Sequence, residues 1–201
     1  MELNNAIDFI KEKDNFLITT HVNPDGDGVG SILGLIGLLK RLKKKYLIVF
    51  HDPPQEKLSF MERIEEVRLF DESMTRDNLY DNAIIIDVPH LDRIGDVVKL
   101  LKKDAQILNI DHHVSNERYG TSNLIEPSAS SSAEIIGSIF ERMNVEMDHA
   151  SAQAIYVGLS VDTGRFRFNN TSPEVFRLAE RLIKAGVRPD IVSDKLYFNT
   201  N

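Results

Sequence analysis

The chain has 201 residues, 42% of them hydrophobic, and its formal net charge is −7 at neutral pH. This length suits one fairly large domain with its own core, or one domain and the start of another. The acidic balance excludes a long nucleic-acid duplex as ligand, because duplex binding needs a dense basic surface, but a short oligonucleotide or a nucleotide stays open. The absence of cysteine excludes disulfides, thiolate catalysis and cysteine-ligated metal sites.

Short apolar runs alternate with helical patterns along the first half of the chain. Strands are predicted at 16–20, 46–50, 83–87 and 106–110. Helices are predicted over about 28–44 and 94–102. Strands that alternate with helices indicate an α/β fold with a doubly wound, mainly parallel sheet flanked by helices.

The second half is predicted to be rich in helices. A capping box at Ser131 and Glu134 starts one that runs to about residue 143. Further helices are predicted over about 148–160 and 171–186, followed by a short amphipathic segment at 191–198. Between them, Arg165 to Phe168 alternates basic and aromatic residues, which predicts a half-buried strand, with base stacking as the alternative.

Acidic and imidazole side chains follow the predicted strands and one helix. The carboxyl ends of strands open into the crevice where α/β sheets bind ligands, so these side chains are expected to meet there. The candidate metal ligands are His21, Asp25, Asp27, Asp87, His112 and Asp162. Their four carboxylates would repel one another strongly, and two divalent cations would neutralise them. The pattern indicates a two-metal phosphoesterase.

Each group also has a structural interpretation that stays open. Asp25 and Asp27 are compatible with a capped Asp-Gly turn, and Asp87 with a helix cap. The side chains of adjacent histidines diverge and do not easily bind one ion. The simplest assignment is that one of His112 and His113 binds a metal ion and the other faces the phosphate as an acid or a hydrogen-bond donor. Asp111 would then orient an imidazole. The alternative is a loop with two surface histidines.

Taken together, these groups resemble the motifs of the DHH phosphoesterase family, in the same order along the chain. The flanking residues 110–116, 130–134 and 158–166 are similar to a subgroup of nanoRNases, 3′-phosphoadenosine 5′-phosphate phosphatases and cyclic di-AMP phosphodiesterases. The resemblance implies a catalytic domain over 1–186. Residues 187–201 would start the connection to a smaller C-terminal substrate-binding domain, whose Gly-Gly-Gly-His-like motif has no match here.

The resemblance also implies two Mn²⁺ ions, with Mg²⁺ or Co²⁺ as alternatives. One ion would be bound by His21, Asp25 and Asp87. The other would be bound by Asp27, Asp87, His112 and Asp162, so that Asp87 bridges the two. His113 would assist the phosphoryl group or the leaving oxygen. Substrate contacts are expected from the cations of Arg93 and Arg118 and, at the start of a helix, from Ser31.

The first functional hypothesis is hydrolysis of short RNA from one end, and of 3′-phosphoadenosine 5′-phosphate, to 5′-mononucleotides. The alternatives are a phosphodiesterase for cyclic di-AMP or its linear product, an inorganic pyrophosphatase, which residues 114–116 disfavour, and a metal- or nucleotide-binding module without turnover. No run is apolar enough to cross a membrane and the N-terminus lacks a signal-like core, so a cytoplasmic protein is expected. A homodimer is compatible with these features.

Overall fold

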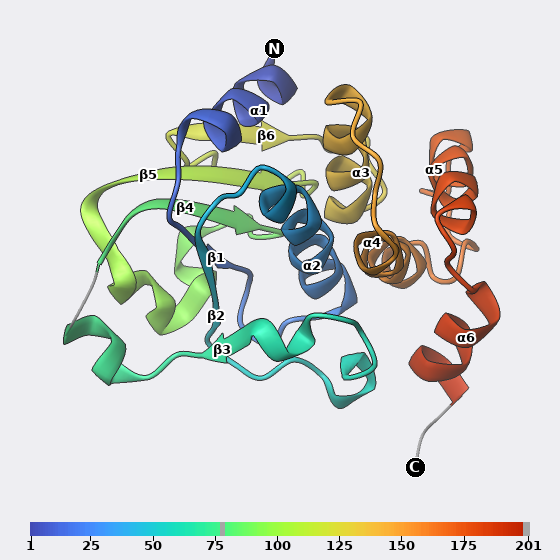
Figure 1. Ribbon diagram of the computed structural model, residues 1–201, viewed down its shortest axis with the longest axis horizontal. Coiled ribbons are helices and arrows are strands. Elements are labelled where there is room, and N and C mark those ends of the chain that lie inside the picture. The colour runs from blue at the N-terminus through green and yellow to red at the C-terminus, as the bar shows by residue number, and fades with distance from the viewer. Residues whose placement is uncertain (77–78, 199–201) are drawn as a thin grey trace.

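Strands from both halves of the chain form one parallel sheet in the computed structural model, which describes residues 1–76 and 79–198 (Figure 1). The strands are β1 (Phe16–Thr19), β2 (Tyr46–Phe50), β3 (Val67–Leu69), β4 (Tyr80–Ile86), β5 (Leu101–Asp111) and β6 (Ser122–Ile125). The α-helices are α1 (Glu2–Glu12), α2 (Gly26–Arg41), α3 (Ser132–Arg142), α4 (His149–Asp162), α5 (Pro173–Lys184) and α6 (Pro189–Ser193). Short 3-10 helices cover Glu56–Leu58, Ile64–Glu66, Glu72–Arg76 and Leu91–Leu100, and a π-helical turn covers Asp194–Phe198.

The strand order is β3-β2-β1-β4-β5-β6, and every neighbouring pair is parallel. The predicted α/β fold with a parallel sheet is therefore confirmed. After β1, the chain adds β2 and β3 on one side of it. It then returns to form β4 on the other side of β1, followed by β5 and β6. The topological switch point therefore lies between β1 and β4. Thr19 pairs with Ile85, and Ile86 pairs with Ile110. Residues that directly follow these strands therefore leave the sheet at one edge.

The two faces of the sheet carry different layers. Alternate side chains of β1 point to opposite faces, with Phe16 and Ile18 on the helical side and Leu17 on the other. Helices α1, α2 and α3 cover the first face, while α5 and α6 lie farthest from the sheet (Figure 1). The second face packs against the 3-10 helix Leu91–Leu100. No helix in the described ranges has the length and hydrophobicity needed to span a membrane.

Glycines on one side of α2 allow α4 to pack against it at close range. A Cβ atom at Gly30 would stand 2.5 Å from the carbonyl oxygen of Ala154, and one at Gly26 would stand 2.5 Å from a methyl group of Val161. Gly34 faces Ile155 and Gly37 faces Ser151 in the same way. The two helices are thus antiparallel, and the C-terminal end of α4 is placed beside the first turn of α2.

The structure corrects two sequence predictions. The helix predicted over 94–102 is a 3-10 helix that ends at Leu100, because Gly95 has φ 60° and ψ −144° and interrupts it, and the next residues already belong to β5. The strand predicted at Arg165 to Phe168 is wrong. Gly164, Arg165 and Phe166 have φ of 55°, 63° and 61°, which no strand can contain.

Several elements were not predicted from the sequence. Helix α1 buries Ile7 and Ile10 against the sheet, and β3 and β6 are edge strands of three and four residues. Strands this short show no clear periodicity. The helices predicted at 131–143, 148–160 and 171–186 correspond to α3, α4 and α5.

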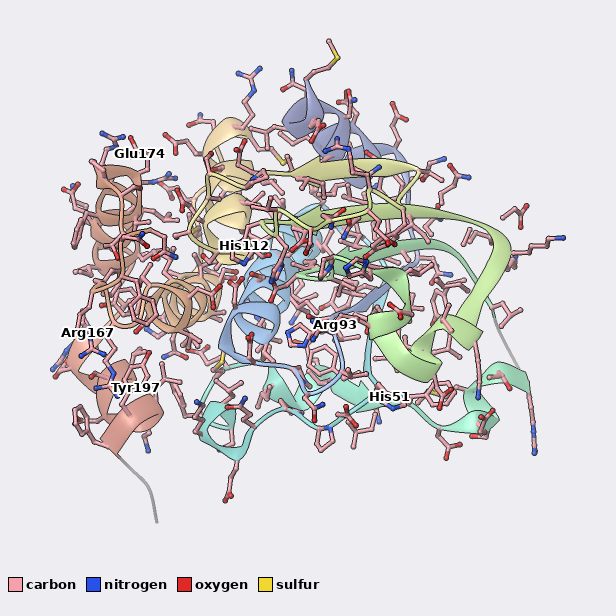
Figure 2. All side chains as sticks on the ribbon, turned by 180° about the vertical axis from the view of Figure 1, so that it is seen from behind. His51, Arg93, His112, Arg167, Glu174 and Tyr197 are labelled. Carbon is pink, nitrogen blue, oxygen red and sulfur yellow. The ribbon has the colours of Figure 1, made fainter. Side chains whose placement is uncertain are left out.

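The segment after residue 186 is helical and packs on α4. The Tyr197 hydroxyl lies 2.9 Å from that of Ser160, and the Arg165 guanidinium stacks 3.8 Å above the Tyr197 ring. Figure 2 shows Tyr197 on the α5 and α6 side of the molecule. The domain boundary after 186 stays a prediction, and residues 199–201 of the predicted connection lie outside the described residues.

Candidate metal centre

The loop after β1 folds back on the first turn of α2. Asp25 is the N-cap of this helix, and its Oδ1 accepts hydrogen bonds from the backbone N–H groups of Asp27 at 2.9 Å and Gly28 at 3.1 Å. The same Oδ1 lies 3.8 Å from Nε2 of His21. Asp25 therefore caps α2, as its structural interpretation predicted. Its carboxylate nevertheless faces the imidazole of His21.

His21 presents one ring nitrogen to two carboxylates. Its Nδ1 lies 2.8 Å from the carbonyl oxygen of Val22, and donation there leaves Nε2 as the ligand atom. Nε2 lies 3.6 Å from Oδ2 of Asp87. Burial acts to lower the pKa of His21, but the carboxylates of Asp25 and Asp87 outweigh it and raise the pKa to about 10. This imidazole therefore holds a proton that a bound cation must displace.

Asp87 lies between the two candidate ligand sets. It directly follows β4 in the left-handed region, with φ 63°, and its N–H donates to the carbonyl of Ile110 at 2.9 Å. Such a conformation is uncommon for a residue other than glycine, although aspartate tolerates it better than most. It directs Oδ2 toward His21 and Oδ1 toward Nε2 of His112, each at 3.6 Å. One carboxylate therefore faces both histidines.

The second set comes from α2, from the residue that follows β5, and from α4. Nε2 of His112 lies 3.3 Å from Asp162 Oδ2 and 4.0 Å from Asp27 Oδ2. Burial, together with the negative charges of Asp87 and Asp162, raises the pKa of Asp27 well above its ordinary value. Asp162 is the last residue of α4, and burial likewise raises its pKa. Because a helix C-terminus favours a cation and disfavours an anion, this position suits a bound metal.

The donor atoms fit two divalent cations. His21, Asp25 and Asp87 each offer an atom within 4.8 Å of the others, and so do Asp27, His112 and Asp162. Ligands about 2.1 Å from one octahedral ion lie about 3 Å apart, so small side-chain movements would close either set. Carboxylate oxygens with one imidazole per set are typical of Mn²⁺ or Mg²⁺ sites rather than structural zinc. The structure thus brings together all six residues singled out in the sequence.

His113 is oriented by Asp111. Its Nδ1 lies 2.7 Å from Asp111 Oδ1, which also accepts the backbone N–H of His112 at 2.9 Å. This hydrogen bond raises the pKa of His113 above its ordinary value, despite partial burial. The His113 side chain is 41% exposed, compared with 16% for His112. His113 is therefore the more accessible of the two to a substrate.

A buried polar network, not anticipated from the sequence, supports this pair. The Asn116 amide donates to Asp111 Oδ2 at 2.6 Å and to Asn109 Oδ1 at 2.8 Å. The Asn109 amide donates to the Tyr119 hydroxyl at 2.9 Å, and that hydroxyl donates to the Val88 carbonyl. The network therefore holds both Asp111 and the turn that follows Asp87. The sequence signal was a polar Asn109 within an apolar strand.

The three residues predicted to bind substrate occupy different environments. Ser31 is fully buried and donates to Asp27 Oδ1 at 3.2 Å, so it supports a candidate ligand. Arg118 pairs with Glu2 of α1. Arg93 is exposed and lies next to the His21 loop, because its carbonyl accepts the Val22 N–H at 2.7 Å (Figure 2). The substrate-binding roles of all three stay predictions.

Comparison with known proteins decides the family. The profile of the DHH family, N-terminal domain, matches residues 15–159. This chain belongs to the DHH family. The DHH-family chain is 34% identical over 181 residues to the bifunctional oligoribonuclease and PAP phosphatase NrnA of Thermus thermophilus. This alignment covers 90% of this chain and 53% of the relative. It is 30% identical over 190 residues to the protein of the same name from Bacillus subtilis, covering 92% and 57% respectively.

The fold is shared with an exopolyphosphatase-related protein from Bacteroides fragilis, with a TM-score of 0.90 and 24% sequence identity. That match covers 100% of this chain and 61% of the other. The chain thus spans just over half the length of the two NrnA relatives. The family resemblance inferred from the motifs is confirmed.

Proposed function

We propose that this DHH-family chain is a two-metal phosphoesterase that hydrolyses short oligoribonucleotides and 3′-phosphoadenosine 5′-phosphate to 5′-mononucleotides, with Mn²⁺ as its cofactor. The observation that carries this proposal is the Asp87 carboxylate, whose two oxygens face His21 and His112 at 3.6 Å each. A carboxylate between two ligand sets is the arrangement that a two-metal phosphoesterase needs. The names of the two relatives support the choice of substrates.

The chemistry divides between the ions and the protein. When bound, two divalent ions supply positive charge that stabilises the attacking and leaving oxygens of an in-line displacement. Water supplies the oxygen that joins phosphorus and releases one proton to the solvent, and the bond from phosphorus to the leaving oxygen breaks. His113 donates its Nε2 proton to that leaving oxygen, because its Nδ1 is held by Asp111. Asp111 accepts from both His112 and His113 and so fixes the orientation of the imidazole.

The acidic net charge of the chain favours a substrate of only a few nucleotides. The net charge of −7 disfavours extended contact with a phosphate backbone. Arg93 is an exposed cation next to the His21 loop and is a candidate to contact one substrate phosphate. A mononucleotide or dinucleotide therefore fits this surface better than a long strand. A cytoplasmic location is proposed with this substrate class.

A panel of substrates tests the proposal. A ribodinucleotide, 3′-phosphoadenosine 5′-phosphate, cyclic di-AMP and inorganic pyrophosphate are incubated with the chain and Mn²⁺, with Asp87→Asn as the matched control. Hydrolysis of the first two, absent in the control, is the expected result. Preferential cleavage of cyclic di-AMP or of pyrophosphate would assign the site to that substrate instead. Binding of two Mn²⁺ without hydrolysis of any of the four would favour a binding module.

A further inference from the structure

The first turn of α3 reaches the candidate metal centre through a residue that its helix cap does not need. Ser131 is the N-cap, and its hydroxyl accepts the N–H of Glu134 at 3.1 Å. The Glu134 carboxylate accepts the N–H of Ser130, the residue before the N-cap, at 2.6 Å. The neighbouring Ser132 hydroxyl takes no part in these contacts, so it is available for another purpose.

Ser132 contacts two candidate metal ligands at once. Its hydroxyl donates to Asp87 Oδ1 at 3.1 Å, and its backbone N–H donates to Asp27 Oδ2 at 2.7 Å. The side chain is fully buried, so water does not replace these contacts easily. The Ala133 N–H donates to the other oxygen of Asp27 at 2.9 Å. Both oxygens of Asp27 are therefore held by the positive end of α3.

The contacts of Ser132 counteract the electrostatic repulsion between the carboxylates of Asp27 and Asp87. Asp27 and Asp87 are buried carboxylates from different elements, and nearby like charges favour their separation or protonation. Ser132 provides one donor to each from a single rigid residue. Each carboxylate oxygen has two lone pairs, so an oxygen that accepts one hydrogen bond can still bind a cation. Hydrogen bonds to metal-binding carboxylates typically tune metal affinity.

We propose that Ser132 is a positioning residue of the metal centre, which holds the carboxylates of Asp27 and Asp87 in place for the ion that they share with His112. This inference rests on the two-metal function proposed above. It assigns the Ser132 hydroxyl to metal affinity and the Ser131 hydroxyl to helix stability. Two adjacent serines in one helix turn thus provide a matched comparison.

Mn²⁺ titration by calorimetry, together with the unfolding temperature of the chelator-treated chain, tests this assignment. Ser132→Ala should weaken binding of one of the two ions by about 10-fold to 100-fold, as for other residues that support metal ligands. Its unfolding temperature without metal should fall modestly, because a buried oxygen of Asp87 loses its donor. Ser132→Cys, nearly isosteric but a weak donor, should also lose affinity without opening a cavity.

Two controls come from the same helix. Ser131→Ala should lower the unfolding temperature and leave both Mn²⁺ affinities unchanged, because it removes the cap alone. Ser138→Ala, at an exposed position, should change neither quantity.

Wild-type affinity for both ions in Ser132→Ala would overturn the inference, and so would an equal loss in Ser131→Ala. A wild-type chain that binds fewer than two Mn²⁺ would instead overturn the proposed two-metal function, and this inference with it.

Discussion

Asp111 and His113 are joined by a contact of 2.7 Å between Oδ1 and Nδ1, and they differ sharply in exposure. Asp111 is fully buried, whereas the imidazole is 41% exposed. Burial raises the pKa of Asp111, but hydrogen bonds from His113 and Asn116 outweigh it and lower that pKa below its usual value. Asp111 therefore stays ionised at neutral pH and fixes which nitrogen of His113 faces outward.

We predict that His113→Ala leaves Mn²⁺ stoichiometry nearly unchanged and lowers kcat by about 10²-fold to 10⁴-fold, the usual contribution of a general acid. His112→Ala should instead lose one of the two ions, because its Nε2 faces Asp27 and Asp162. Metal analysis and steady-state kinetics on both variants separate the two roles. Loss of metal in His113→Ala alone would show that the roles are exchanged.

Asp87→Ala should be the most damaging single change at the centre. Its two oxygens face different histidines, so removing it affects both ligand sets. We expect both Mn²⁺ affinities to fall in calorimetry and the activity to be lost. Asp25→Ala should mainly weaken one ion and lower helix stability by about 1 kcal/mol through the lost cap. Retention of one tight ion in Asp87→Ala would contradict the bridging assignment.

The buried network behind Asp111 should affect turnover. Asn116→Ala removes the donor to Asp111 Oδ2 and leaves a buried carboxylate oxygen unsatisfied, which typically costs about 1–3 kcal/mol of unfolding free energy. Tyr119→Phe removes only one hydroxyl and should cost about 1 kcal/mol. Both variants should lower kcat more than they raise KM, because the network orients His113 rather than contacting substrate. A pure KM effect would argue against this role.

Stability without metal should fall as the pH rises. The pKa of His21 is raised to about 10 and that of His112 to about 9, against 6.5 for an ordinary histidine. A raised folded-state pKa contributes stability that is complete below pH 6.5 and is lost as the pH rises through about 9 to 10. The unfolding temperature of chelator-treated protein should therefore drop between about pH 6.5 and pH 10.

Two comparisons isolate this effect from other titrations. The Mn²⁺-loaded protein should show a shallower pH dependence, because ions rather than protons neutralise the carboxylates. A chelator-treated His112→Gln variant should also show a shallower slope. Parallel curves for all three samples would mean that the slope arises outside the metal centre.

The sequence by itself determined the strands that carry the candidate ligands. Each core strand is a short apolar run, and residues such as Asp87 and Asp111 mark where it ends. In a parallel sheet, carboxyl ends meet at one edge, so the proximity of His21, Asp87 and His112 followed from local pattern and topology. The alternation of basic and aromatic residues from Arg165 to Phe168 wrongly predicted a strand. Gly164 and the two residues after it adopt left-handed conformations, and Phe166 packs against Tyr156.

Only the tertiary structure decided how the second half completes the centre. Asp162 reaches the site because glycines on α2 let α4 pack closely, and this depends on contacts between whole helix faces. Ser132 lies 45 residues from Asp87 and 105 from Asp27 in the chain, yet it bonds to both. Local sequence signals report propensity and periodicity over one or two turns. Hydrogen bonds across such separations depend on the packing of the folded chain. The sequence pattern therefore identified the start of a helix at Ser131, but not the contacts of Ser132 with two candidate metal ligands.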